Sequence, residues 1–173
     1  MAGVVAGCQE GNRQAQKQLY DEFRERVFRL ALRMVGSQDA PDVLQQVFLQ
    51  TYRNIQQFSG RASFSTWLYR LAINECLQFR RRERRPGCES LACEPIDRSP
   101  SHVMHAQRQE LLEQALQRLD PELRAIFLLR EVDGLPYSEI AKVLKIPQGT
   151  VGSRLNRARQ QLREHFVQLG WEP

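Results

Sequence analysis

The sequence lacks several features that define whole classes of protein. Its 173 residues contain no run of about 18 consecutive apolar residues, which excludes a membrane-spanning helix. The first residues have neither the basic nor the apolar stretch of a secretory signal. The four cysteines are irregularly spaced and too few for a disulfide scaffold. We therefore expect a cytoplasmic globular protein whose thiols are reduced.

Lysine is also scarce, so nearly all of the positive charge of the chain is carried by arginine. Of the 25 basic residues, 22 are arginines, and 20 acidic residues leave a net charge of +5. The planar guanidinium group suits phosphates and base edges better than an ammonium group does. The arginine excess indicates a polyanionic partner, although the position of the charges matters more than their sum.

Strand-like alternation is absent, and apolar residues instead recur every three or four positions. This spacing predicts helices at about 13–35, 39–58, 64–83, 111–119, 121–133, 138–144 and 151–166, with Ser138 as a cap and 147–150 as a turn. The intervening segment is rich in proline and acidic side chains, which predicts a flexible linker. We expect an all-α protein of two small helical domains, residues 1–85 and 108–173, joined by a linker at 86–107.

Residues 138–163 have the form of a helix-turn-helix. Ile140, Ala141 and Leu144 share one face of the first helix, and Val151 and Leu155 begin the buried face of the second. Side chains near the start of the second helix reach base edges when such a helix enters a major groove. The outward set is Thr150, Ser153, Arg154, Asn156 and Arg157, with Arg159 placed for the DNA backbone. The alternative is a solvated helical hairpin with arginines on its wet face.

The helix at 64–83 combines arginines, amides and aromatic rings. Residues 61–85 hold seven arginines and two acids. A polar stripe follows the helical repeat at Thr66, Arg70, Asn74, Gln78, Arg81 and Arg85, and the nearby rings are Phe58, Phe64, Trp67, Tyr69 and Phe79. Single-stranded nucleic acid binds through charge for its phosphates and flat faces for its bases. The alternatives are rings that belong to the core and arginines that form a solvated helix end.

The helix before it presents a mixed polar face with one apolar side chain. This face consists of Asp42, Gln45, Gln46, Leu49 and Arg53. A leucine among polar residues on an exposed face indicates a protein-binding patch, although single exposed leucines are common.

Four segments together resemble a known family. Residues 42–53 and 58–74 are similar to region 2, and residues 119–141 and 149–159 to region 4, of the bacterial extracytoplasmic-function sigma factors, group IV of the sigma-70 family. The resemblance implies a non-enzymatic specificity subunit of RNA polymerase that needs no cofactor. It also implies that an anti-sigma factor covers the polymerase-binding faces of the inactive protein.

The resemblance assigns roles to particular residues. The mixed polar face, Asp42, Gln45, Gln46, Leu49 and Arg53, would bind the clamp helices of the largest polymerase subunit. Region 2 would melt and read the -10 element with Phe58, Arg61, Ser63, Thr66, Trp67, Tyr69, Arg70, Asn74, Gln78 and Arg81. Region 4 would bind the polymerase flap and read the -35 element with Thr150, Ser153, Arg154, Asn156, Arg157 and Arg159.

Two residues depart from the family pattern. Gln46 stands where an acidic residue is usual, and this weakens the electrostatic attraction to the clamp. Gly152 stands where lysine or arginine is common, so one DNA contact is removed from the reading helix and that helix is loosened.

Two other readings of the sequence remain open, and an enzyme is the least favoured. A stand-alone helix-turn-helix regulator explains the C-terminal half but not the arginine-striped helix. A metal or redox sensor would use Cys88, Cys93, His102 and His105, whose spacing is not that of a standard zinc finger. No glycine-rich phosphate loop, acid pair or nucleophile arrangement indicates catalysis.

Overall fold

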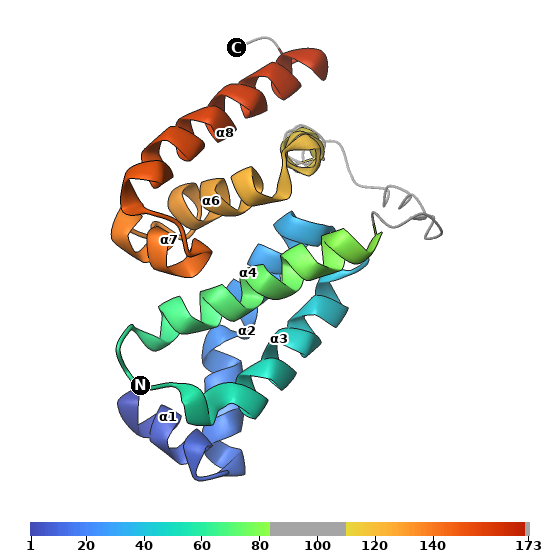
Figure 1. Ribbon diagram of the computed structural model, residues 1–173. Helices are drawn as coiled ribbons and strands as arrows, with labels where there is room; N and C mark the ends of the chain where they lie inside the picture. The colour runs from blue at the N-terminus through green and yellow to red at the C-terminus, as the bar shows by residue number, and fades with distance from the viewer. Residues whose placement is uncertain (84–109, 172–173) are drawn as a thin grey trace.

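The computed structural model describes residues 1–83 and 110–171, and every regular element in these two ranges is a helix (Figure 1). The N-terminal half contains α1 (Ala2–Gln9), α2 (Arg13–Val35), α3 (Ala40–Asn54), the 3-10 helix η1 (Ile55–Gln57) and α4 (Phe64–Glu83). The C-terminal half contains a helix at 110–118, α6 (Pro121–Glu131), α7 (Tyr137–Leu144) and α8 (Gln148–Gln168). The expected all-α class is confirmed. The expected linker, 86–107, lies outside the described residues.

The N-terminal half is a bundle in which α2 packs against α1, α3 and α4. The bounds predicted for α2 and α4 are those observed. The Asn12 side chain caps α2 by accepting hydrogen bonds from the amides of Gln14 at 2.8 Å and Ala15 at 3.2 Å. Gly36 ends α2 with a φ of +100°, a value that favours glycine. These contacts fix the two ends of α2 at the residues where the apolar pattern begins and ends.

The helix α1 was not predicted from the sequence. Its eight residues bury only Val5 and Cys8, which is too short a pattern to give a recognisable period. It packs closely on α2 because Gly7 has no side chain: a Cβ at this position would lie 2.9 Å from the Cβ of Ala15. The glycine is therefore required by a close approach of the two helices.

The C-terminal half corrects two expected boundaries. Residues 147–150 do not form a separate turn, because α8 already begins at Gln148 after the N-cap Pro147. Ser138 is not a cap: it lies in the first turn of α7, whose N-cap is Pro136. The start of α6 is as expected, since the Asp120 carboxylate accepts a hydrogen bond from the Glu122 amide at 2.9 Å.

The two halves pack against each other. Figure 1 shows α6 and α7 lying alongside α4, and the contacts between these helices agree with that view. The buried apolar side chains of both halves belong to one continuous cluster. The Arg124 side chain of α6 crosses the boundary and donates a hydrogen bond to the carbonyl oxygen of Met34 at the end of α2. In this conformation the two helical domains are docked.

Candidate nucleic-acid and partner interfaces

Much of the polar stripe on α4 faces solvent. Arg70, Asn74, Gln78 and Arg81 are all exposed, and Arg61 precedes them on an exposed loop. The apolar side chains on the opposite side of α4 are buried, among them Leu68, Ala72 and Cys76. Because these contacts fix the rotation of the helix, the stripe is held outward as one continuous surface.

Thr66 and Tyr69 do not share this exposure, because the C-terminal half covers them. They are 6% and 8% exposed. The Thr66 hydroxyl donates to the Glu139 carboxylate on α7 at 2.5 Å, and the Tyr69 hydroxyl donates to Asp133, which follows α6, at 2.8 Å. The sequence pattern placed Thr66 on the polar stripe that was expected to face solvent. The docked domain turns this end of the stripe into an internal contact.

The local electrostatics reflect these contacts. Burial raises the pKa of the Tyr69 phenol, and the nearby Asp133 carboxylate adds to that effect. Burial likewise raises the pKa of the Asp133 carboxyl, although the Tyr69 hydrogen bond opposes the change. The pKa of Glu139 is lowered by hydrogen bonds from Lys142 and then from Thr66. Both directions follow from the burial of the Tyr69–Asp133 contact between the two halves.

An aromatic-lined cavity of 570 Å³ lies where the loop before α4 meets α1. Phe58 packs edge-on against Phe64 and Trp67, with ring centroids 5.4 and 5.6 Å apart. The Ser63 hydroxyl oxygen accepts the Thr66 amide proton at 3.1 Å and holds the start of α4. The cavity is lined by Met1, Ala2, Val5, Ala6, Gln9, Phe23, Phe58, Ser59, Gly60, Ala62, Ser63, Phe64 and Ser65.

The contribution of α1 to this cavity was missed by sequence reasoning. The Gln9 side chain donates hydrogen bonds to the carbonyl oxygens of Ile55 at 3.0 Å and Phe58 at 3.2 Å. The Gln56 side chain donates in return to the Gln9 carbonyl oxygen. No local sequence signal indicates these contacts, which join residues more than 40 positions apart. Gln9 thus fixes the loop that carries Phe58.

The surface expected to read duplex DNA is formed mainly by α8. Ser153, Asn156, Arg157 and Arg159 are exposed, whereas Thr150 and Arg154 are half-buried. Two of the arginines form ion pairs with α6: Arg154 with Glu122 at 3.1 Å, and Arg159 with Glu131 at 2.5 Å. The hydrogen bond from Arg159 to Glu131 raises the pKa of its guanidinium group. The expected reading residues therefore share one helix, with part of their charge held by carboxylates.

Gly152 lies on this helix with room for a side chain. A Cβ there would meet Tyr137 Cε2 at 3.7 Å, an ordinary van der Waals distance. Packing does not require glycine at this position.

The expected partner-binding face of α3 is exposed throughout. Asp42, Gln45, Gln46, Leu49 and Arg53 all face solvent, and Leu49 is 39% exposed. The opposite side of α3 buries Val43, Val47, Phe48 and Thr51. The face is therefore available for a partner in the docked conformation.

The proposed metal ligands Cys88, Cys93, His102 and His105 lie outside the described residues. Across residues 1–83 and 110–171, no three His, Cys, Asp or Glu side chains gather as metal ligands would. Cys8 and Cys76 are buried thiols, and burial raises the pKa of Cys76 to about 12. No helix in the described ranges combines the length and apolar content needed to cross a bilayer.

Comparisons with known proteins agree with this arrangement. Residues 19–86 match the family Sigma-70 region 2, and residues 109–162 match Sigma-70, region 4. The chain is 31% identical to the ECF RNA polymerase sigma-E factor of Haemophilus influenzae over 96% of this chain and 95% of that protein. It is 32% identical to the sigma-E factor of Escherichia coli K12 over 92% and 90% of the two chains.

Solved structures show the same fold. CnrH, in complex with the cytosolic domain of CnrY, matches with a TM-score of 0.69 and 23% identity over 93% of both chains. The sigma factor RpoE of Bartonella quintana, in complex with the anti-sigma factor NepR, also matches with a TM-score of 0.69 and 23% identity, over 87% of this chain and 96% of that chain. The chain therefore belongs to the extracytoplasmic-function sigma factors of the sigma-70 family, which direct the initiation of transcription.

Proposed function

We propose that this protein binds core RNA polymerase and directs it to promoters by reading the -10 element with α4 and the -35 element with α8. The observation that carries the proposal is the exposed stripe of Arg70, Asn74, Gln78 and Arg81 beside an aromatic-lined cavity. A stand-alone regulator that binds only duplex DNA has no use for this combination. Melted DNA requires it, because phosphates and unstacked bases must be bound together.

The cavity beside α4 suits a nucleobase turned out of the helix stack. Its volume of 570 Å³ falls within the range of small-ligand sites, about 300–1,000 Å³. Phe58 and Phe64 offer ring faces and edges, and Ser59 and Ser63 offer hydroxyl groups. Extrusion of a base costs least where the strand is already opening. We assign the -10 base to this cavity, with Asn74 and the arginines of the stripe holding the strand beside it.

The -35 element is assigned to the exposed side of α8. Arg157 and Asn156 suit guanine and adenine edges, and Ser153 suits either. Thr150, Arg154 and Arg159 flank them on the same helix. The flap of polymerase would bind the same half of the chain, residues 108–173.

Core polymerase is assigned to the exposed face of α3, through its clamp helices. Leu49 supplies an apolar contact, and Asp42 and Arg53 supply charge at the two ends of this face. Two of the matched structures are complexes of a sigma factor or its relative with a second protein, and one of these is named an anti-sigma factor. We therefore assign an anti-sigma factor as a further partner. Such a subunit acts in the cytoplasm, without enzymatic activity of its own.

The test is promoter selection with reconstituted holoenzyme and a randomised promoter library. Arg157→Ala is expected to lose about 1–3 kcal/mol of discrimination at -35 positions only. Asn74→Ala is expected to change the -10 preference and strand opening only. Arg24→Ala, on an exposed part of α2, is the matched control and leaves both preferences unchanged. Absence of any transcript with wild-type protein, together with tight duplex binding, would establish the stand-alone regulator instead.

A further inference from the structure

The ring of Tyr137 lies beside the proposed -35 surface but is not part of the residue set that the sequence predicted for it. Tyr137 is the first residue of α7, and it is 37% exposed. We propose that Tyr137 is a further specificity-determining residue for the -35 element and that its ring contacts the 5-methyl group of a thymine. This inference rests on the proposed function, since it concerns the same duplex-reading surface of α8.

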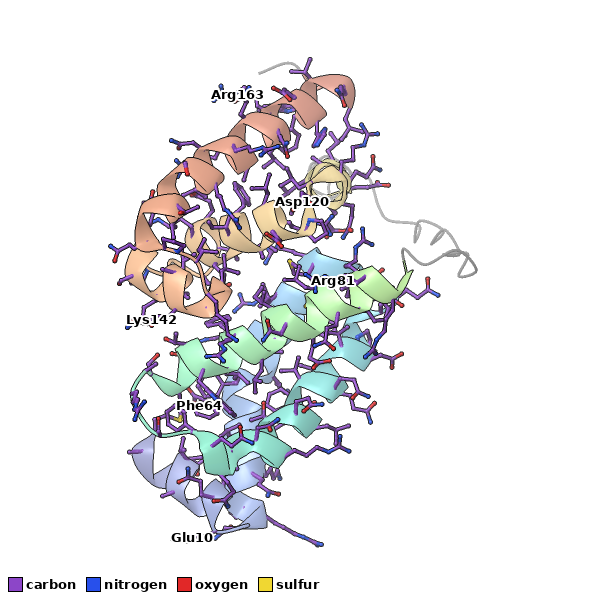
Figure 2. All side chains as sticks on the ribbon, in the orientation of Figure 1. Glu10, Phe64, Arg81, Asp120, Lys142 and Arg163 are labelled. Carbon is purple, nitrogen blue, oxygen red and sulfur yellow. The ribbon has the colours of Figure 1, made fainter. Side chains whose placement is uncertain are left out.

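The packing of α7 directs the Tyr137 side chain towards α8. The helical repeat places Tyr137 on the same side of α7 as Ile140, which is fully buried. Figure 2 shows α7, which carries Lys142, beside one end of α8, whereas Arg163 lies towards the other end of α8. The ring therefore lies against the first turns of α8, from which a duplex would be read.

The absence of a side chain at Gly152 leaves the ring uncovered. A Cβ at this position would meet Tyr137 Cε2 at 3.7 Å. A long side chain such as arginine would therefore extend from position 152 across the edge of the ring. Glycine leaves that edge open, so the ring is available to a base on the exposed side of α8.

Arg130 holds the ring from the end of α6. Its guanidinium carbon lies over the Tyr137 ring, 5.4 Å from the centroid, which is within the range of a cation–π contact. Arg130 is fixed in turn because it donates a hydrogen bond to the Leu135 carbonyl oxygen at 3.1 Å. A ring that is already held in place loses less conformational entropy when it binds DNA.

The neighbouring residue Asn156 indicates which base the ring contacts. Positions 152 and 156 are four residues apart on α8, so their Cβ positions lie about 5–6 Å apart on one side of the helix. Asparagine suits the adenine edge, and adenine pairs with thymine, whose 5-methyl group also faces the major groove and is contacted by apolar side chains. An A·T pair read by Asn156 thus brings a methyl group within reach of the Tyr137 ring.

The experiment measures binding of reconstituted holoenzyme to a promoter fragment that carries the -35 element recovered by promoter selection. Each thymine of that element is replaced in turn by uracil, which also pairs with adenine but lacks the 5-methyl group. The variants are Tyr137→Ala, Tyr137→Phe and Gly152→Arg. The control Val132→Ala truncates another exposed apolar side chain, at the end of α6. Circular dichroism establishes that each variant is helical.

We expect one thymine whose replacement by uracil weakens wild-type binding about fourfold, the effect of losing one buried methyl-sized group. Tyr137→Phe and Val132→Ala should keep this difference because the ring is retained. Tyr137→Ala removes the ring and Gly152→Arg covers it, so both should bind the two fragments equally. Gly152→Arg keeps Tyr137 itself and tests the inference even where Tyr137→Ala does not fold.

The inference is overturned if the wild-type holoenzyme binds every uracil fragment as tightly as the thymine fragment. It is also overturned if the thymine preference persists in Gly152→Arg. Equal weakening of Tyr137→Ala and Tyr137→Phe on both fragments would assign the hydroxyl group to a phosphate and would overturn it as well. In these cases promoter selection still returns a -35 element that depends on Arg157, and the proposed function stands. A holoenzyme that selects no -35 element contradicts the proposed function itself.

Discussion

Replacement of Arg124 tests whether a buried guanidinium group holds the docked protein together. Arg124 has no measurable exposure, although it lies on an amphipathic helix. It donates to the Met34 carbonyl oxygen, to the side chain and carbonyl oxygens of Gln117, both at 2.7 Å, and to the Leu119 carbonyl oxygen at 3.2 Å. One side chain thus joins the end of α2, the end of the helix at 110–118 and α6.

The perturbation is Arg124→Met, which preserves an unbranched apolar stem and removes every donor. Three backbone carbonyl groups lose a partner, at about 1–3 kcal/mol each when they stay buried. The variant also avoids the cost of burying a cation, and this offsets part of the loss. We expect a net destabilisation of about 3–5 kcal/mol, a large share of the about 5–15 kcal/mol that holds a typical domain folded. Arg124→Lys should lie between, because an ammonium group cannot reach all the acceptors.

The assay is urea unfolding of the full-length protein, followed by far-ultraviolet circular dichroism. The control Arg118→Met changes an exposed arginine on the neighbouring helix and should alter the free energy of unfolding by less than about 0.5 kcal/mol. The reasoning fails if Arg124→Met unfolds within about 1 kcal/mol of wild type. It also fails if Arg124→Lys is as stable as wild type, because the geometry of the guanidinium group would then be irrelevant.

Three further predictions follow from individual residues. Gln9→Leu removes two hydrogen bonds to the loop before α4, worth about 1 kcal/mol each, and should relax the -10 base preference while the -35 preference measured in promoter selection stays unchanged. Gly152→Arg should bind -35 duplex more tightly than wild type, with a salt dependence steeper by about one phosphate contact. Gly152→Ala should only raise the free energy of unfolding, by about 1 kcal/mol. Equal DNA binding by the two variants would contradict this prediction. Burial raises the pKa of Cys76 to about 12, so its thiol should resist alkylation by iodoacetamide at pH 8 in the native protein. In urea the pKa returns to the ordinary value and the thiol should react. Rapid modification of Cys76 in the native protein, mapped by mass spectrometry, would contradict its burial.

Sequence periodicity predicted the long helices well because each buries one continuous face. The bounds of α2 and α4 follow from this pattern, and Asn12 and Gly36 cap the two ends of α2 in the structure. The exposed face of α3 and most of the α4 stripe follow for the same reason. A helix that buries only two side chains, such as α1, leaves too little pattern to detect.

Contacts between distant segments were beyond the sequence because nothing local encodes them. Thr66 was expected to face solvent with the rest of the polar stripe on α4. Helical periodicity separates polar from apolar side chains, but it does not show which polar side chains contact another segment of the chain. The same limit applies to Arg124, whose charge gives no sign that it is buried among backbone oxygens. Periodicity therefore predicted which faces of the helices are exposed, but not that the C-terminal half covers Thr66 and Tyr69.

The two ion pairs between α8 and α6 connect the proposed -35 surface to a second helix. A guanidinium group that is held by Glu122 or Glu131 samples fewer rotamers than a free one, so under the proposed function it would meet the groove from a fixed side. Each carboxylate would also repel nearby phosphates of a bound duplex and restrict the position of α8 in the groove. If α8 reads the -35 element as proposed, promoter preference would be a joint property of α8 and α6, and substitutions on α6 could change it while the base-contacting side chains of α8 stay the same.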